Sequence, residues 1–286
     1  MLLPRFEYRH ASSLVQATTL LGENPEARPL AGGTDLLVDM RERRQQPRML
    51  VDISDLAELR GIVAGPDGAV WIGGGVTVGE LLASPLLAER LPALRQAAHD
   101  FADFLTRNKA TLGGNLANAS PGADLVVPLL ALDARVVIAG SGNERTLALD
   151  AFLVGPRRTG LRPGELVRQV VVPTSGGRQF WYKLGLKRGG AIAVVSVATQ
   201  VELDAGGRCQ AARIALGAVA PRPFRARDAE AAAIGGPLTP DRVARAAELA
   251  ARASQPISDV RGEADYRTAM VRALVARGLA AASDGP

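Results

Sequence analysis

Over the first 173 residues, short apolar runs alternate with segments that have the spacing of amphipathic helices. In residues 12–21 the apolar side chains recur on one helical face, and Ser13 stands three residues before Gln16, the spacing of a helix cap. Thr77 and Glu80 repeat that spacing before another helical segment. Apolar runs between these segments predict short strands. The region is therefore predicted to mix strands and helices.

The pattern changes after residues 174–178, a short polar and glycine-rich segment that is a candidate domain boundary. Three longer apolar runs follow it, and the last two are separated by a turn sequence typical of a hairpin. The strands predicted from these runs lie within residues 180–187, 191–203 and 209–221.

Two helices are predicted after these strands. The first begins at Thr239, a good N-cap that is followed by proline. The second carries Tyr266 and Met270 at helical spacing, and we expect both side chains in the core. Strands followed by helices predict an α+β fold, with one domain at residues 1–173 and a second at 178–286.

The composition narrows the chemistry that the chain can perform. Of the 286 residues, 47% are hydrophobic and 22% are charged, as in ordinary globular proteins. One cysteine, Cys209, and two histidines, His10 and His99, leave too few groups for an internal disulfide, an iron–sulfur cluster or a structural zinc site. Redox chemistry in this chain would therefore need an organic cofactor.

The charge pattern and the apolar runs bear on partners and location. The 34 lysines and arginines exceed the 29 acidic residues by five, and they are dispersed except for Arg41, Arg43, Arg44 and the pair Arg157 and Arg158. Aromatic residues make up only 4%, so we expect no nucleic-acid partner. The apolar runs are too short or too interrupted to span a bilayer, and the first ten residues lack a signal-peptide core. We expect a cytoplasmic protein without a membrane span.

Two glycine loops are the candidate binding elements. The first loop is Leu30-Ala31-Gly32-Gly33-Thr34-Asp35-Leu36, and the second loop is Thr111-Leu112-Gly113-Gly114-Asn115. Paired glycines can turn successive backbone N–H groups toward one point and form a nest for phosphate oxygens. Two nests could hold a dinucleotide pyrophosphate from opposite sides, whereas the alternative is that both Gly-Gly pairs are only tight turns. Neither a Rossmann fingerprint nor a Walker lysine motif is present.

Three segments of the chain follow a known pattern: AGGTDLL at 31–37, TLGGNLANASPGADLVVPLLALDA at 111–134 and RGEADYRTAMVRALVARGL at 261–279. Together they resemble the FAD-binding medium subunit of molybdenum hydroxylases, a family that includes the medium chains of xanthine dehydrogenase and carbon monoxide dehydrogenase. The resemblance implies an FAD-binding domain of the vanillyl-alcohol-oxidase (PCMH) type, with lobes at about 1–55 and 56–173. A small C-terminal domain of the carbon monoxide dehydrogenase flavoprotein type, an antiparallel sheet with helices, would follow at 178–286.

The resemblance also implies which residues contact the cofactor. Both glycine loops would bind the FAD pyrophosphate and its adjoining groups. Further cofactor-contacting positions of the family fall on Phe101, Asp124, Val167 and Lys183. A cation such as Lys183 near the isoalloxazine ring would favour a reduced, anionic flavin. The resemblance implies no catalytic side chain and no metal ligand in this chain.

The function implied by the resemblance is electron transfer within a complex. A large partner subunit would carry the molybdenum cofactor (molybdopterin), and a small partner subunit would carry [2Fe–2S] clusters that pass electrons to FAD. An external acceptor such as NAD, a quinone or oxygen would then take them, and the complex could double into a dimer of heterotrimers. The alternatives are a self-contained FAD-dependent oxidoreductase, which would need its own acid–base residues and often a His or Cys bonded to FAD, and a noncatalytic nucleotide-binding module.

Overall fold

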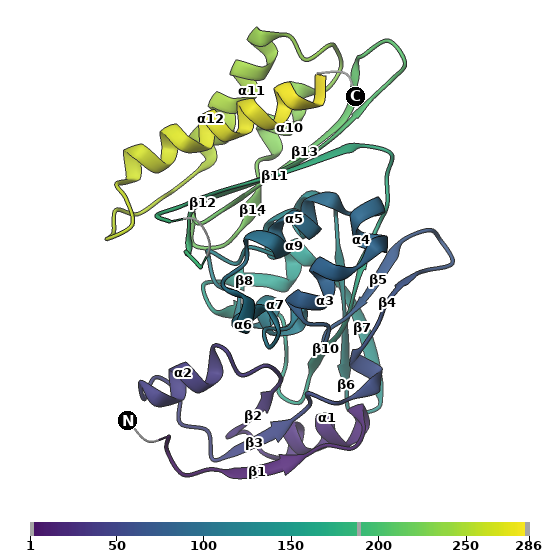
Figure 1. Ribbon diagram of the computed structural model, residues 1–286, viewed down its shortest axis with the longest axis vertical. Coiled ribbons are helices and arrows are strands. Elements are labelled where there is room, and N and C mark those ends of the chain that lie inside the picture. The colour runs from purple at the N-terminus through teal and green to yellow at the C-terminus, as the bar shows by residue number, and fades with distance from the viewer. Residues whose placement is uncertain (1–2, 188–189, 284–286) are drawn as a thin grey trace.

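The computed structural model describes residues 3–187 and 190–283, and its first part is a small parallel sheet in the order β1-β3-β2 (Figure 1). We call residues 3–55 the N-terminal lobe. Its elements are β1 (Glu7–His10), α1 (Leu14–Glu23), β2 (Ala27–Leu30), α2 (Leu36–Arg41) and β3 (Met49–Asp52). The Ser13 side chain accepts a hydrogen bond from Gln16 N, as predicted, and α1 buries one apolar face. The first glycine loop connects β2 to α2.

The second part is a five-stranded antiparallel sheet in the order β4-β5-β10-β6-β7. We call residues 56–173 the central lobe. Its strands are β4 (Ile62–Ala64), β5 (Val70–Gly73), β6 (Arg135–Gly140), β7 (Asn143–Ala148) and β10 (Leu166–Val172), with a separate hairpin of β8 (Leu153–Gly155) and β9 (Arg158–Thr159). Its helices are η1 (Ala57–Leu59), α3 (Val78–Ala83), α4 (Pro85–Arg90), α5 (Pro92–Asp100), α6 (Phe104–Arg107), α7 (Leu112–Asn118), α8 (Val126–Ala131) and α9 (Leu149–Phe152). The capping box predicted at Thr77 and Glu80 is present at the start of α3.

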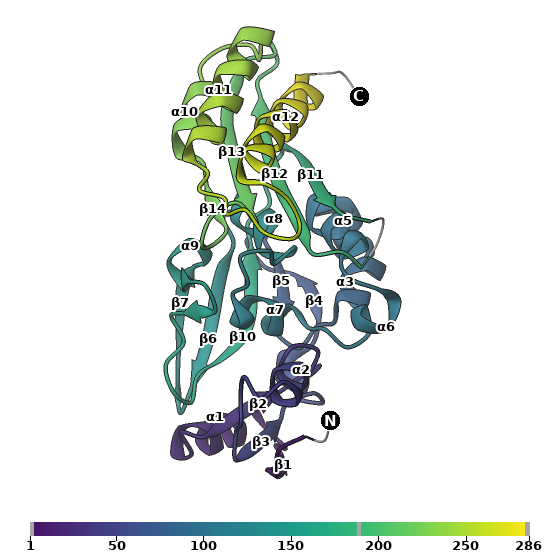
Figure 2. The same ribbon diagram turned by 90° about the vertical axis from the view of Figure 1, so that its left-hand side faces the viewer.

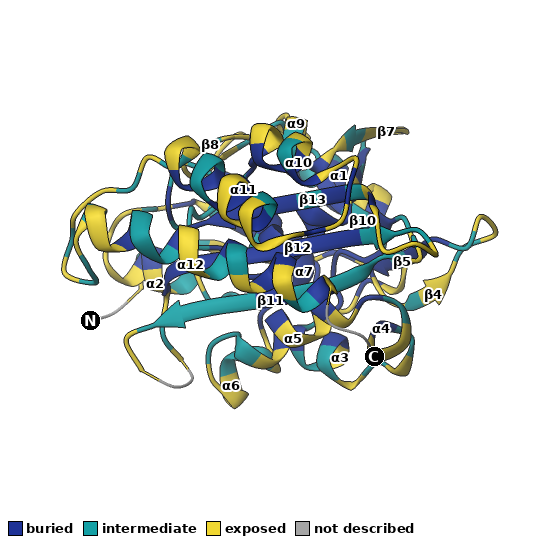
Figure 3. Cartoon of the chain, turned by 90° about the horizontal axis from the view of Figure 1, so that it is seen from above, coloured by how far each residue is buried: buried dark blue, intermediate teal, exposed yellow. Residues whose placement is uncertain are grey.

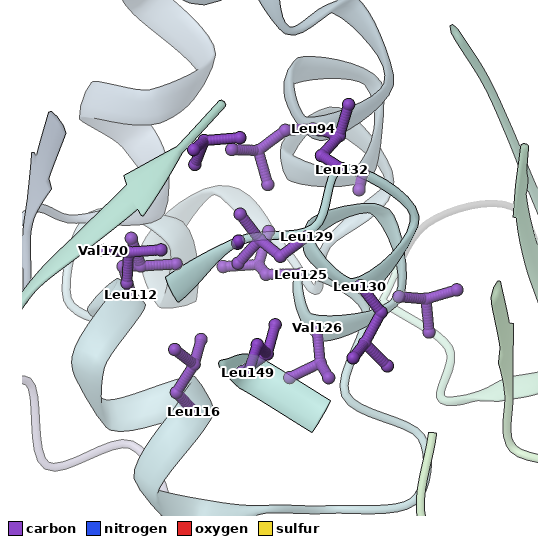
Figure 4. Packing of buried hydrophobic residues seen from close by; sticks show 14 of the residues in the cluster. Leu94, Leu112, Leu116, Leu125, Val126, Leu129, Leu130, Leu132, Leu149 and Val170 are labelled. Carbon is purple, nitrogen blue, oxygen red and sulfur yellow. The ribbon is translucent and has the colours of Figure 1, made fainter. Parts of the chain in front are cut away.

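The core of the central lobe forms around α8. Leu112 and Leu116 of α7 pack into the same apolar cluster as Leu125 and Leu129 of the α8 segment and Val170 of β10 (Figure 4). All five of these side chains are fully buried. Because close packing resists displacement, this cluster holds α7, and with it the second glycine loop, against the sheet.

The C-terminal region has a four-stranded antiparallel sheet in the order β11-β12-β13-β14, followed by three helices. The elements are β11 (Arg178–Gly185), β12 (Ala193–Leu203), β13 (Cys209–Gly217), β14 (Phe224–Arg225), α10 (Arg227–Ala233), α11 (Pro240–Ala253) and α12 (Ala264–Ser283). The three predicted strands, the hairpin and the two predicted helices are confirmed, and so is the α+β fold class. Tyr266 is 48% exposed, so its expected burial was wrong: α12 turns Val271 and Val275 inward instead.

The C-terminal sheet is covered on both faces, which explains why nine consecutive residues of β12 are buried (Figure 3). Helices α10 to α12 lie on one side of this sheet, and α5 and α8 of the central lobe contact its other side (Figure 2). Trp181, Ala198 and Ala215 accordingly belong to the core cluster of the central lobe. The core of the central lobe thus extends onto this face of the C-terminal sheet, while the helices on the other face pack in a second apolar cluster.

A charge network reinforces that contact. The buried guanidinium of Arg225 donates to Glu230 and reaches Asp133, which follows α8. Arg213 Nε donates to the same Asp133 carboxylate over 2.6 Å. Arg225 and Glu230 are both buried, so breaking that pair would leave an uncompensated charge, whereas Asp133 is half exposed.

The N-terminal and central lobes also meet along an apolar contact. Leu14 and Ala17 of α1 cluster with Ala139 of β6 and Leu166 of β10. In the part of the chain that the structure describes, no helix is long and apolar enough to cross a membrane.

Candidate cofactor-binding cleft

A cleft of about 400 Å³ opens between the N-terminal and central lobes, where both glycine loops meet. Most of the residues proposed from the sequence line it. They are Ala31, Gly32, Gly33, Thr34, Asp35, Leu36, Phe101, Thr111, Gly113, Gly114, Asn115 and Val167. Leu30, Leu112, Asp124 and Lys183 are not part of its lining. The fold therefore brings together two loops that are about eighty residues apart in the sequence.

The first loop presents backbone donors to the cleft. The N–H groups of residues 32–36 have no acceptor within the described ranges 3–187 and 190–283, although all five residues line the cleft. Gly33 has φ +70°, a left-handed conformation that glycine adopts without strain. Successive unpaired N–H groups of this kind are what an anion-binding nest requires.

The first loop also lies against the central lobe at Gly32. A Cβ added there would lie 1.7 Å from Lys109 O, so only glycine allows the two backbones to come this close. Gly32 is thus required by contact between the lobes, whereas Gly33 is required by its backbone conformation.

The second loop differs from the first because its N–H groups are already used. Leu112 N donates to Val76 O at 2.9 Å, and Gly113 N donates to Gly74 O at 2.7 Å. Gly114 N donates to Thr111 Oγ1 at 3.1 Å, and Asn115 N donates to Thr111 O at 3.0 Å. The sequence suggests two equivalent nests, but the structure has one open row of donors and one closed helix cap.

Gly113 is needed for the close packing of the second loop. A Cβ on Gly113 would lie 2.7 Å from Gly74 O, and one on Gly74 would lie 2.1 Å from Val167 O. Three backbone segments are therefore stacked without side chains between them. This stack places the backbone of the cleft-lining residue Val167 behind the second loop.

The second loop offers the cleft a side chain instead of a row of N–H groups. Asn115 lines the cleft, and its Oδ1 atom is buried without a hydrogen-bond partner among the described residues. A buried acceptor left unpaired costs about 1–3 kcal/mol. A hydroxyl or N–H group of a bound ligand would remove that cost.

Lys183 and Asp124 form a buried ion pair outside the cleft lining. Lys183 Nζ lies 2.5 Å from Asp124 Oδ2 and also donates to the backbone oxygen of Asp100, the neighbour of the cleft residue Phe101. Burial raises the pKa of Asp124 to about 6, although the charge and hydrogen bond of Lys183 oppose the shift. Contact of either residue with a cofactor stays a prediction, since neither belongs to the cleft lining.

Several lining residues were missed by sequence reasoning. Arg157 is the most informative, because it lines the cleft and binds Asp39, which is 118 residues away in the sequence. The pair Arg157 and Arg158 is visible in the sequence as a local basic cluster. Nothing in that local pattern indicates a partner in a different lobe.

The chain matches two protein families along its length. Residues 4–175 match the family described as the FAD binding domain in molybdopterin dehydrogenase, and residues 180–282 match the CO dehydrogenase flavoprotein C-terminal domain. A carbon monoxide dehydrogenase medium chain from Hydrogenophaga pseudoflava is 36% identical over 99% of this chain and 98% of its own length. This chain belongs to the FAD-binding medium-subunit family of molybdenum hydroxylases.

Other members of the medium-subunit family support the same assignment. The putative xanthine dehydrogenase FAD-binding subunit of Escherichia coli K12 is 32% identical over 93% of this chain and 92% of its own length. A chain in the crystal structure of the Cu,Mo-CO dehydrogenase superposes with a TM-score of 0.95 and 33% identity, covering 99% of both chains. The chain is accordingly an oxidoreductase subunit with an FAD-binding fold.

The residues of the cleft fit FAD. Its pyrophosphate is an anion that needs hydrogen-bond donors, and the first loop supplies a row of N–H groups without protein acceptors. Its hydroxyl groups are donors, and the buried Asn115 Oδ1 atom is an acceptor without a partner among the residues described. Both glycine loops of the sequence motif therefore line the cleft, but they offer a ligand different kinds of atom.

Proposed function

We propose that this chain is the flavin subunit of a molybdenum hydroxylase complex. In this proposal FAD in the cleft accepts electrons from [2Fe–2S] clusters of a small partner subunit and passes them to NAD, a quinone or oxygen. A large partner subunit with the molybdenum cofactor transforms the substrate. The observation that carries the proposal is a cleft with donors for a dinucleotide in a chain whose whole length matches medium subunits.

The residues of the chain would act by binding and positioning. The N–H row of residues 32–36 would hold the pyrophosphate, and Asn115 would accept a hydrogen bond from a cofactor hydroxyl or N–H group. Phe101 and Val167 would give apolar contact. When bound, the isoalloxazine ring supplies the reversible uptake of one or two electrons.

The cleft chemistry supports electron transfer over a self-contained oxidoreductase. The cleft lining contains neither histidine nor cysteine, and Cys209 is buried in β13. Of its three carboxylates, Asp39 is bound by Arg44 and Arg157, and Glu165 is bound by Arg145. Burial raises the pKa of the third, Asp35. Groups held in ion pairs are poor general bases, because the pairing stabilises their charged form.

The assembly is part of the same proposal. Relatives carry the names medium chain and medium subunit, which describe one component of a larger enzyme. We infer one large and one small partner subunit for this chain, a dimer of such heterotrimers, and a cytoplasmic location.

Affinity purification of the tagged chain from its own organism tests the proposal. We expect one FAD per chain, released intact by acid precipitation, together with one molybdenum-containing and one iron–sulfur partner. Substrate should reduce the flavin only in the complex. A lone FAD-bearing chain that turns over substrate would establish the self-contained oxidoreductase instead, and a chain that takes up no FAD would leave the nucleotide-binding module.

A further inference from the structure

Arg157 joins the two sides of the cleft. It stands at the tip of the β8–β9 hairpin in the central lobe, and its Nη1 atom donates to Asp39 Oδ2 and to Asn118 Oδ1, each at 3.1 Å. Asp39 belongs to α2 of the N-terminal lobe, and Asn118 ends α7 of the central lobe. Arg157 N also donates to Ala119 O at 3.0 Å, which anchors the hairpin tip beside α7.

Asp39, which accepts this hydrogen bond from Arg157, is held in place by other residues. The Asp39 side chain is only 4% exposed, and it also accepts hydrogen bonds from Arg44 Nε at 2.8 Å and from Gln45 Nε2 at 3.0 Å. Burial alone would raise the pKa of Asp39, but the hydrogen bonds from Gln45 and Arg44 and the charge of Arg157 outweigh it and lower the pKa. Asp39 is therefore a charged and oriented partner for Arg157.

Asp39 is one of the two residues through which helix α2 is buried. Its buried residues are Asp39 and Met40, and the helix begins where the N–H row of the first loop ends, at Leu36. The apolar contact between the lobes includes α1, and α1 and α2 lie apart in Figure 1. A restraint on α2 is thus a restraint on the donor row itself.

We propose that Arg157 is a positioning residue for FAD, acting as a clasp that ties α2 to the central lobe and keeps the first loop over the cofactor. The inference rests on the proposed function, since it takes FAD as the occupant of the cleft. The clasp acts through Asp39 and Asn118 without touching the reacting ring. Its loss lets α2 and the first loop move away from the second loop, so FAD leaves faster.

The first test compares FAD release from the full-length chain and from two single variants. Flavin fluorescence after dilution measures the release rate, and thermal unfolding of the FAD-free protein is measured in parallel. Arg157→Gln should release FAD roughly threefold faster, because the Arg157 side chain is 53% exposed and water screens its pair with Asp39. Arg158→Gln removes the same charge from the exposed neighbouring residue, and it should release FAD at the wild-type rate.

A double-mutant cycle with Asp39→Asn identifies how Arg157 acts. If Arg157 works through Asp39, then the double variant releases FAD no faster than the faster single variant, because both changes break one contact. Equal acceleration by Arg157→Gln in both backgrounds would mean that Arg157 contacts FAD directly, which overturns the clasp. Should Asp39→Asn fail to fold, Asn118→Ala replaces it as the other anchor in the cycle.

The outcomes separate this inference from the proposed function. If Arg157→Gln releases FAD at the wild-type rate, the clasp is overturned, while FAD binding and electron transfer stay in place. Failure of the wild-type chain to bind FAD at all would instead remove the proposed function. A lowered unfolding temperature of FAD-free Arg157→Gln with unchanged release would show a purely structural role and would also overturn the clasp.

Discussion

The first and second glycine loops have the same Gly-Gly design but different physical roles. In the first loop, the N–H groups of residues 32–36 have no acceptors in the described part of the chain. In the second loop, four consecutive N–H groups are bound to Val76, Gly74 and Thr111. The first loop is therefore open to an anion, whereas the second is a finished helix cap whose contribution to the cleft is a side chain.

The difference shows that a Gly-Gly pair is not by itself a phosphate site. Position 113 needs glycine because the backbone of Gly74 lies against it. Position 32 needs glycine because the backbone oxygen of Lys109 lies against it. Each of these glycines serves packing between segments. The capacity to bind an anion depends on which N–H groups remain free after packing, and that differs between the loops.

Gly32→Ala is expected to have the largest effect, because it separates the first loop from the central lobe. Its Cβ would meet a backbone oxygen at 1.7 Å, which cannot be relieved by a side-chain rotation. An overpacking cost near 3 kcal/mol would weaken FAD binding by roughly a hundredfold. Fluorescence titration of the FAD-free variant with FAD measures this. Wild-type affinity would show that the lobes need not approach each other to bind the cofactor.

Gly113→Ala should act mainly on stability. Its Cβ would lie 2.7 Å from Gly74 O inside the packed stack behind the second loop. We expect the free energy of unfolding of the FAD-free chain to fall by about 2 kcal/mol. Denaturant unfolding followed by circular dichroism checks it. A variant with wild-type stability and poor FAD binding would reverse the roles assigned to the two loops.

Asn115→Ala should weaken FAD binding without destabilising the FAD-free chain. The substitution removes an amide oxygen that is buried without a partner in the described residues, so folding loses no protein hydrogen bond. The loss of one hydrogen bond to the cofactor corresponds to roughly a tenfold weaker affinity. Titration with FAD and thermal unfolding of the FAD-free variant are compared. A large drop in unfolding temperature would contradict the assignment.

The smallest expected effect comes from the two loop threonines. Thr111 caps α7 through its bond with Gly114 N, so Thr111→Ala should cost about 1 kcal/mol of stability. Thr34 makes no side-chain hydrogen bond within residues 3–187 and 190–283, so Thr34→Ala is the matched control and should unfold like the wild type. Equal losses in both variants would mean that the first loop is also a closed cap.

Local signals predicted several elements of the fold. The capping pairs at Ser13 and Thr77, the hairpin and the helix that begins after Thr239 all depend on residues close in sequence. The two loops were found in the same way, and they line one cleft. Their resemblance to a known family supplied Phe101 and Val167, which also line it.

The remaining features depend on long-range contacts that a local pattern does not contain. Two N–H groups of the second loop, those of Leu112 and Gly113, are bound by residues more than thirty positions earlier. Arg157 binds Asp39 across 118 residues. Tyr266 has the correct helical spacing for burial, but the face that α12 presents to the sheet is set by Val271 and Val275. Which donors remain free is therefore a property of the assembled fold.

The C-terminal sheet is covered on one face by its own helices and on the other by helices of the central lobe, and this affects the order in which the chain can fold. Helix α8 is made before β12 and β13, and the side of it that packs on these strands has no cover until they have been synthesised. An exposed apolar surface in an incomplete chain favours aggregation. A nascent chain arrested near residue 180 should therefore depend on chaperones more than one arrested after β13.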